Sequence, residues 1–280
     1  MSHADKVFKA TCRDILANGT DTRGQKVRPH WEDGAPAYTI KQFGVVNRYD
    51  LRKEFPALTL RRIALKSCMD EILWIYQKKS NNIHDLKSHI WDSWADEAGS
   101  IGKCYGYVAG DPFTFQNERV DQTDYIRKQL KETPYSRRIM TNLYQFQYLA
   151  EGHLDPCAFN FILNVTKEDG QLVLNGILNQ RSQDMLAANG WNVCQYSIFL
   201  MMLAQEAGMV PGQFVHVIAD AHIYDRHIPL VKELIGRRTY PAPRVWLNPQ
   251  VKDFYDFTVD DLHVENYEAG PQIKNIPVAV

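Results

Sequence analysis

The chain has 280 residues, of which 45% are apolar and 23% charged, and its formal net charge is -1. This composition is typical of folded globular proteins and excludes disordered and fibrous chains. The charge argues against a dedicated nucleic-acid-binding protein, which normally carries a basic excess on one face. Because no linker, repeat or low-complexity run divides the sequence, we expect one domain over residues 1–280.

The lack of a recognisable targeting signal and the pattern of cysteines both favour a reduced, cytoplasmic protein. The first thirty residues lack the apolar core and cleavage site of a signal peptide. The longest apolar stretch, around Tyr196 to Leu203, is too short to cross a bilayer. The cysteines are odd in number and include no CxxC pair, which predicts reduced thiols and neither a disulfide framework nor a metal site. They are Cys12, Cys68, Cys104, Cys157 and Cys194.

The first half of the chain contains three helix signals. Residues 4–17 carry spaced apolar positions ahead of an Asn-Gly pair, which is typical of a helix end. Residues 59–77 show mostly helical apolar spacing and predict a long buried helix. Residues 121–132 begin with acidic side chains that suit the positive end of a helix dipole, and Pro134 would stop this third helix.

The second half of the chain has mainly strand signals. Between Ser136 and Asp184, short β-type runs alternate with turns and predict a sheet. A buried helix should follow, with Asn192 at its N-cap and Gly208 beyond its end. Residues 213–220 return to alternation, and the run RVWLN around position 246 should add a strand. The pattern predicts an α+β fold.

Cys157 is the candidate nucleophile, because it follows a proline and lies at a turn that enters a predicted strand. A thiol attacks as thiolate, and its usual pKa of ~8.5 requires a cation nearby at neutral pH. The Arg137-Arg138 pair and Arg181, beside Ser182, could supply that cation and bind a phosphate. A solvated edge and a polar turn explain these arginines equally well. No P-loop or dinucleotide-binding motif is present.

Other polar residues stand in apolar surroundings. Glu71 is flanked by apolar side chains, so burial would raise its pKa and let it shuttle protons, although a place on a solvated helix stripe is as plausible. Asn192 could be a simple N-cap. His222 and Tyr224 alternate onto one side of an extended segment and could bind a sugar hydroxyl. A histidine satisfied within the core is the alternative.

Nine stretches, taken together and in order, are the most specific signal in the sequence. They are EFPALTLRR, DEILWIY, IWDSWADE, YSRRI, DPCAFNF, NQRSQD, GWNVCQYS, DAHIY and IPVAV. This set resembles folate-dependent thymidylate synthase over nearly the whole chain, and is most similar to its Bacillus and phage branch. The resemblance implies an α+β fold of one large domain with a twisted, mostly mixed β-sheet packed by helices, and a face of this sheet that forms a homodimer interface.

The resemblance implies reductive methylation of dUMP to dTMP, with 5,10-methylenetetrahydrofolate as one-carbon donor and reductant, no metal, and dihydrofolate as product. Cys157 matches the nucleophile that adds to C6 of the uracil ring. Asn192 matches the residue at the pyrimidine amide edge. Glu71 matches a proton-relay carboxylate, and Tyr105 matches a tyrosine near the C5 deprotonation.

The resemblance also implies a site shared between two chains. Arg137 and Arg138 match arginines donated across the homodimer interface. The residues implied at dUMP are Arg23, Arg137, Arg138, Arg181, Ser182, Gln183, Asp184, Asn192, His222, Ile223 and Tyr224. Those implied at the folate are Asp184, Ile90, Trp91 and Ala279, the last in a tail that folds over the bound cofactor and excludes water.

The sequence departs from the family pattern at several positions. DTRGQKVRPH matches the N-terminal phosphate loop only loosely, so Arg23 is the first choice for phosphate and Arg28 the second. Ala158 follows the nucleophile where many members have histidine. Arg61 and Ala64 stand where many relatives have a lysine and a histidine, which puts the folate-tail contacts in doubt.

Three rival functions remain open. A pyrimidine-nucleotide hydroxymethylase would share the thiolate addition but form no dihydrofolate, and a cytosine-specific one should carry Asp at position 192. A catalytically silent nucleotide- or RNA-binding protein would keep the arginines but form no covalent adduct, and the near-zero net charge disfavours it. A cysteine protease would need a histidine base beside the thiol.

Overall fold

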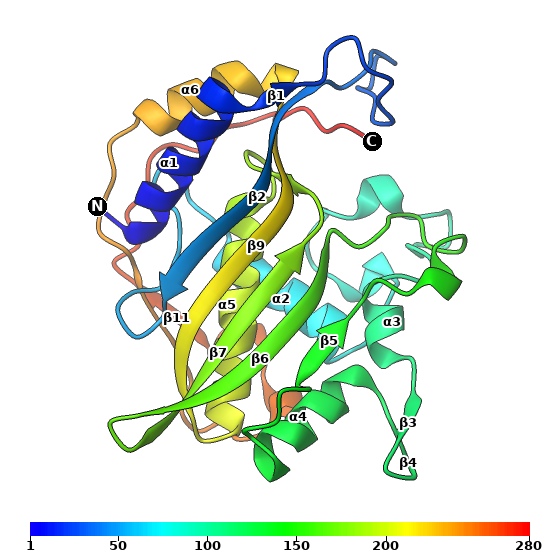
Figure 1. The fold of residues 1–280 in the computed structure, drawn as a ribbon, viewed down its shortest axis with the longest axis vertical. Coiled ribbons are helices and arrows are strands. Elements are labelled where there is room, and N and C mark those ends of the chain that lie inside the picture. The colour runs from blue at the N-terminus through cyan, green and yellow to red at the C-terminus, as the bar shows by residue number, and fades with distance from the viewer.

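A computed structural model describes residues 1–280, and its centre is a seven-stranded sheet (Figure 1). The strand order is β1-β2-β9-β7-β6-β5, with β8 paired to β9 outside this path. β9 runs parallel to β7 and β8, while the other pairs are antiparallel, so the sheet is mixed as expected. The bounds are β1 Thr20–Asp21, β2 Thr39–Asp50, β5 Met140–Asn142, β6 Ala158–Glu168, β7 Gln171–Gln180, β8 Gln183–Asp184 and β9 Val210–Tyr224.

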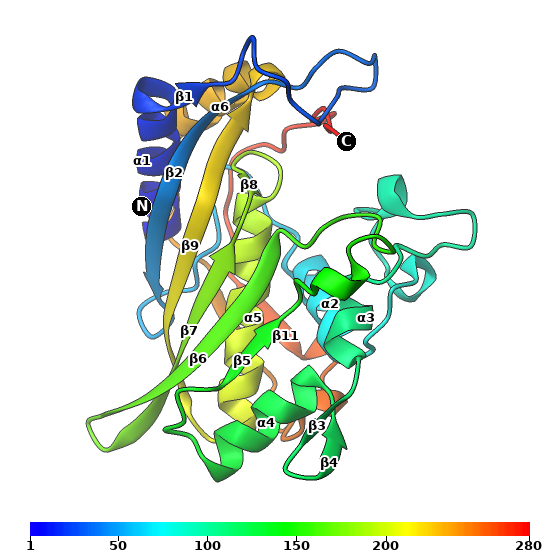
Figure 2. The same cartoon turned by 45° about the vertical axis from the view of Figure 1, so that its right-hand side comes forward.

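Six α-helices and two small hairpins surround this sheet. α5 packs behind the sheet and α2 lies against α5, while α1 and α6 lie together at the β2 edge (Figures 1 and 2). The helices are α1 His3–Asn18, α2 Leu65–Tyr76, α3 Gly106–Gly110, α4 Gln122–Glu132, α5 Asn189–Glu206 and α6 Ile228–Gly236. The hairpins pair β3 Phe113–Phe115 with β4 Glu118–Val120, and β10 Arg244–Leu247 with β11 Leu262–Glu265. No helix is both long and apolar enough to cross a membrane.

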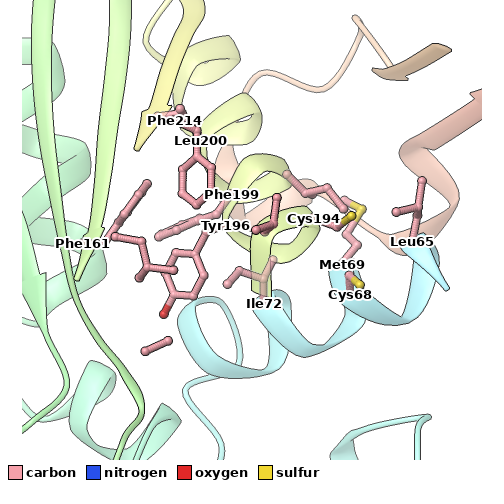
Figure 3. Packing of buried hydrophobic residues seen from close by; sticks show 14 of the residues in the cluster. Leu65, Cys68, Met69, Ile72, Phe161, Cys194, Tyr196, Phe199, Leu200 and Phe214 are labelled. Carbon is pink, nitrogen blue, oxygen red and sulfur yellow. The ribbon is translucent and has the colours of Figure 1, made fainter. Parts of the chain in front are cut away.

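The core lies where α5 meets the sheet and α2. Figure 3 shows Phe161 of β6 and Phe214 of β9 pointing toward Phe199 of α5, with Ile72 of α2 on the other side of that helix. These side chains belong to one cluster of 57 buried residues. Gly176 makes the approach possible, because a Cβ atom there would lie 2.6 Å from the Phe161 ring. The close packing fixes α5, and with it the end of α5 that faces the site, against the sheet.

Several sequence predictions of secondary structure are confirmed. The first helix covers residues 3–18, and its N-cap Ser2 accepts a hydrogen bond from the Asp5 N–H. α4 begins after its N-cap Asp121 and ends before Pro134. The predicted strands around the Pro-Cys pair, after the KEDG turn and around Trp246 are all present.

Two predicted helix starts are wrong. The helix predicted over residues 59–77 begins only at Leu65, because Thr59 is buried and donates hydrogen bonds from its N–H and hydroxyl to the carboxylate of Asp5 in α1. Asn192 is not an N-cap either. α5 begins at Asn189, and the Asn192 N–H donates to the Ala188 carbonyl at 2.9 Å, so Asn192 lies inside the first turn.

One face of the sheet has no helix over it. No element crosses in front of β2, β9, β7 and β6 in Figure 1. Large apolar side chains are exposed there and at the sheet's β5 edge: Phe43 is 88% exposed, Val46 49%, Ile177 38% and Met140 38%. The sequence predictions missed β2, which carries Phe43 and Val46, because these positions do not show the alternation of a half-buried strand.

Candidate active site

The Cys157 thiol lies where β6 begins and β7 ends. The Cys157 N–H donates to the Tyr105 hydroxyl at 3.0 Å, and the Cys157 carbonyl accepts the Arg181 N–H at 2.9 Å. The Arg181 guanidinium reaches Sγ at 3.7 Å and also donates to the Pro156 carbonyl at 3.0 Å. One arginine thus fixes the turn before the strand and places positive charge beside the thiol.

The charge state of Cys157 reflects two opposing effects. Burial raises the pKa of the Cys157 thiol, and the guanidiniums of Arg181 and Arg28 offset part of this rise. Asp155 adds to the rise. The thiol therefore stays largely protonated at neutral pH until additional positive charge or a base lowers its pKa.

Glu71 lies on α2 in a pocket made of indoles. It is 5% exposed, and Oε1 accepts a hydrogen bond from Trp91 Nε1 at 2.8 Å while Oε2 accepts one from Trp191 Nε1. Burial raises the pKa of Glu71 to about 7, although both indole donors oppose this rise. The alternative of a solvated helix stripe is wrong, and the carboxyl can hold or release a proton near neutral pH.

Tyr105 connects the thiol to the Glu71 pocket. Its hydroxyl accepts the Cys157 N–H, and its ring meets the Trp91 ring edge-on at 4.9 Å between centroids. Tyr105 has a φ of 42°, in the left-handed region, and it is buried. The Tyr105 side chain thus lies between Cys157 and Trp91, on a backbone conformation that is sparsely populated by residues other than glycine.

Asn192 faces the ends of β7 and β8 from the first turn of α5. Its Oδ1 accepts hydrogen bonds from Gln180 Nε2 at 3.2 Å and from Gln183 Nε2 at 3.3 Å. Its Nδ2 donates to Gln195 Oε1 at 3.3 Å. The carboxamide of Asn192 is therefore held in a defined orientation by three neighbouring glutamines.

The end of β9 carries a second polar group. His222 Nδ1 lies 2.9 Å from Asp220 Oδ1, and the His222 and Tyr224 rings are 4.9 Å apart. Burial raises the pKa of Tyr224 to about 12, and the charges of Asp184 and Cys157 contribute to this rise. The Ile223 side chain is completely buried and points to the other side of the strand, so it does not join this group.

Asp184 is held in its ionised form. Burial would raise its pKa, but the hydrogen bond and charge of His227 lower it below its usual range. Its Oδ1 accepts the N–H of Leu186 at 2.8 Å, and its Oδ2 lies 3.5 Å from His227 Nδ1. Asp184 therefore offers a fixed negative charge, which contributes to the raised pKa of Tyr224.

The C-terminal tail lies against the loop that carries Arg28. The Val280 N–H donates to the His30 carbonyl at 3.0 Å, and the His30 N–H donates back to Val280 at 2.9 Å. His227 Nε2 lies 2.7 Å from the Pro277 carbonyl. Ala279 is half-buried between these two anchors. The tail thus connects the loop after β1 to the Asp184–His227 pair.

Several candidates stay away from the thiol in this chain. Arg137 and Arg138 are exposed in a turn before β5 rather than at the start of the strand, and the only bonds there join backbone atoms of Arg138 to neighbouring side chains. The Arg23 side chain is 69% exposed and pairs with Asp21. Ile90 is 39% exposed, whereas its neighbour Trp91 is buried.

The sequence predictions missed four residues that position the site. Trp191 binds Glu71, His227 binds Asp184, and Gln180 and His216 form a chain behind Asn192. Gln180 and Trp191 each stand next to a predicted site residue, Arg181 and Asn192, which was the available signal. His216 and His227 had no comparable signal, because their partners lie far away in the sequence.

Comparison with known proteins agrees with this geometry. The family model for thymidylate synthase matches residues 6–280. Thymidylate synthase 1 of Bacillus subtilis (strain 168) is 40% identical over 278 residues, covering 98% of each chain, and thymidylate synthase of Bacillus phage phi3T is 39% identical over the same length. The solved thermostable thymidylate synthase A from Bacillus subtilis superposes with a TM-score of 0.91, at 39% identity and 99% coverage of both chains. The chain therefore belongs to the thymidylate synthase family, as its sequence motifs implied.

Proposed function

We propose that this chain converts dUMP and 5,10-methylenetetrahydrofolate to dTMP and dihydrofolate through a covalent bond between Cys157 and uracil C6. The observation that supports the proposal most is the contact between the Cys157 thiol and Arg181. This contact places the proposed nucleophile beside a cation that can bind phosphate, in a chain that belongs to the thymidylate synthase family.

The nucleotide phosphate would lie beside Cys157, held by Arg181 and the Ser182 hydroxyl. For the arginine of the N-terminal loop, the structure favours Arg28 over Arg23. Arg23 is paired with Asp21, whereas the charge of Arg28 opposes part of the rise in the pKa of both Cys157 and Tyr224. We therefore assign the phosphate contact to Arg28.

The base and the sugar would meet two different groups. Asn192 would hydrogen-bond the amide edge of uracil and stabilise the negative charge that develops on O4. His222 and Tyr224 offer donors and acceptors to the ribose 3′-hydroxyl at the end of β9. Neither group lies on a flexible loop, because α5 and β9 are both packed into the core.

Catalysis would start when the Cys157 thiolate adds to C6 and forms a carbon–sulfur bond, which makes C5 a carbon nucleophile. The folate supplies the methylene carbon and then a hydride. Glu71, with a pKa of about 7, would relay protons near O4 and the folate, and Tyr105 would assist removal of the C5 proton. Cleavage of the carbon–sulfur bond returns the thiolate and releases dTMP.

Three groups of this chain suit contacts with the folate. Trp91 and Ile90 provide an apolar wall, and the ionised Asp184 carboxylate is an acceptor for the pterin. The tail at Ala279, anchored by the hydrogen bonds between Val280 and His30, would cover it. Arg61 does not fit a role at the folate tail, because it is 9% exposed and donates to the Leu186 carbonyl at 2.6 Å.

We propose that two chains form a homodimer through the open sheet face. Phe43, Val46 and Ile177 on that face are apolar and exposed in one chain. Arg137 and Arg138 are exposed and unconnected to Cys157 in their own chain, which suits donation to the phosphate of a second copy.

Incubation with 5-fluoro-dUMP and methylenetetrahydrofolate tests the nucleophile, because a fluorine at C5 blocks proton loss and traps the adduct. We expect intact-protein mass spectrometry to show one ternary adduct per site, located on the Cys157 peptide. Absorbance should show dihydrofolate formation with dUMP.

The Cys157→Ser variant should form no adduct and no dihydrofolate, yet still bind dUMP. Cys12→Ala, which changes a buried thiol of α1, is the matched control and should keep both signals. An adduct on another residue, or turnover by Cys157→Ser, would refute the assignment.

A further inference from the structure

His216 has no place in the proposed chemistry, yet it is connected to Asn192. It lies in the middle of β9, is completely buried, and its Nε2 is 2.7 Å from Gln180 Oε1. Gln180, at the end of β7, in turn donates from Nε2 to Asn192 Oδ1 at 3.2 Å. The three side chains form a continuous line of hydrogen bonds from the core to the base-binding residue.

A backbone carbonyl fixes the direction of these bonds. Gln180 Nε2 also lies 3.2 Å from the Ser182 carbonyl, which can only accept. The nitrogen end of the Gln180 amide must therefore face Ser182 and Asn192, and the oxygen end must face His216. An amide oxygen only accepts, so His216 Nε2 has to carry the hydrogen.

Burial keeps the His216 ring neutral, and no group on the opposite strand competes for its hydrogen. Burial lowers the pKa of His216 to about 3, so the imidazole is neutral and carries a single N–H. Asn47 lies directly opposite His216 in the β2–β9 pair, and its Oδ1 accepts from the Thr11 hydroxyl at 3.2 Å. The Asn47 Nδ2 donor and the His216 Nδ1 acceptor are both buried, and neither has a hydrogen-bond partner. No hydrogen bond therefore competes with the contact between His216 Nε2 and Gln180 Oε1.

We propose that His216 is a positioning residue that sets the preference for uracil over cytosine. Its Nε2–H holds the Gln180 amide so that Gln180 donates to Asn192 Oδ1. One Nδ2–H of Asn192 donates to Gln195, which leaves the other for the base. Uracil presents the O4 acceptor to this donor, whereas cytosine presents an amino donor. The inference rests on the proposed contact between Asn192 and the pyrimidine.

Loss of the His216 donor would leave Gln180 Oε1 buried without a partner, which is costly. The Gln180 amide would turn or withdraw, and Asn192 would lose one of the three glutamine hydrogen bonds that fix its orientation. Because the phosphate and ribose contacts lie elsewhere, dUMP and dCMP should keep them equally. The ratio of the two affinities therefore reports the orientation of Asn192 separately from general damage to the site.

The test compares dissociation constants for dUMP and dCMP, measured by isothermal titration calorimetry on the full-length protein. For His216→Phe we expect dUMP to bind about tenfold more weakly while dCMP changes by less than about twofold. His216→Gln, which retains an N–H donor, should restore most of the preference. Phe214→Leu, a matched change two residues away in the same buried strand, should lower the melting temperature and leave the ratio unchanged.

Asn192→Ala separates the two proposals. If wild-type protein prefers dUMP and Asn192→Ala loses the preference while His216→Phe keeps it, the role of His216 is refuted and the Asn192 contact stands. If wild-type protein does not distinguish the nucleotides, both proposals fail. Should His216→Phe not fold, His216→Met provides the same comparison with a more adaptable side chain, and an unchanged ratio there would equally refute the role.

Discussion

At the scale of single residues, burial rather than a charged partner determines the shifted pKa of Glu71. Two indole N–H groups bind its oxygens, but no cation pairs with it, so the neutral form remains accessible up to a pKa of about 7. Uncharged donors stabilise a carboxylate less than an arginine would. The site thereby keeps a carboxyl that can exchange protons at neutral pH.

This pKa makes a prediction about stability. The folded carboxyl of Glu71 keeps its proton up to about pH 7, whereas the unfolded one loses it near 4.5. Between these values the folded state binds more protons, so the free energy of unfolding falls as pH rises. The Glu71→Gln variant has no carboxyl to titrate here, so it does not lose this part of the free energy of unfolding. Relative to the parent, the variant should gain on the order of 3 kcal/mol between pH 4 and pH 8.

Urea unfolding of both proteins across this pH range measures the effect. Glu97→Gln, at an exposed position, is the control and should track the parent at every pH. A stability difference between Glu71→Gln and the parent that does not change with pH would contradict the buried, titrating carboxyl. The same variant should lose most turnover, because Gln cannot relay a proton.

At the scale of elements, one arginine ties α4 to α5. Arg127 of α4 donates to Glu206 at the end of α5 and to Asp253 at 2.7 Å, and its guanidinium lies 4.4 Å from the centre of the Tyr255 ring. The Glu206 side chain is only 2% exposed. A carboxylate so deeply buried depends on its partner for stability.

Arg127→Met should therefore destabilise the protein by roughly 3–5 kcal/mol, because it leaves the Glu206 charge buried and less well paired. Lys66→Met breaks the exposed pair with Asp260 and should cost less than about 1 kcal/mol. Chemical unfolding of both variants gives the comparison. Equal losses would show that Lys131, which also contacts Glu206, compensates for Arg127.

At the scale of the whole molecule, the open sheet face and the free arginines lead to one test of a shared site. Cys157→Ser chains and Arg137→Ala chains should each be inactive alone. After unfolding and refolding together, random pairing would give complete sites at about one quarter of positions, because one site of each mixed dimer has both residues. Activity measured against the wild type gives that fraction.

A second mixture is the control for complementation. Arg181 and Cys157 belong to the same site of one chain, since they are in contact. Mixing Cys157→Ser with Arg181→Ala should therefore restore nothing. Restoration in that mixture, or none in the first after mixed dimers are shown by mass, would contradict donation of Arg137 across the interface.

The features that the amino-acid sequence is sufficient to predict depend on neighbouring residues and on motifs. Caps and periodicity act within a few positions, so the predicted bounds of α1 and α4 agree with the fold to within one or two residues. The ordered motifs alone indicate the family, and the comparisons confirm it. The candidate roles of the site residues, Cys157 among them, also come from these motifs.

The remaining features depend on contacts between distant parts of the chain and emerge only in the folded protein. Thr59 donates a hydrogen bond to Asp5 in α1, so α2 begins later than its sequence pattern predicts. One face of β2 is not covered by helices, so its exposed apolar side chains do not give the alternating pattern of a half-buried strand. Trp91 and Trp191 meet at Glu71 only after folding. Likewise, the line of hydrogen bonds from His216 to Asn192 arises from positions that the folded backbone brings together. Local signals cannot encode such contacts, because their energies depend on burial and on partners remote in sequence.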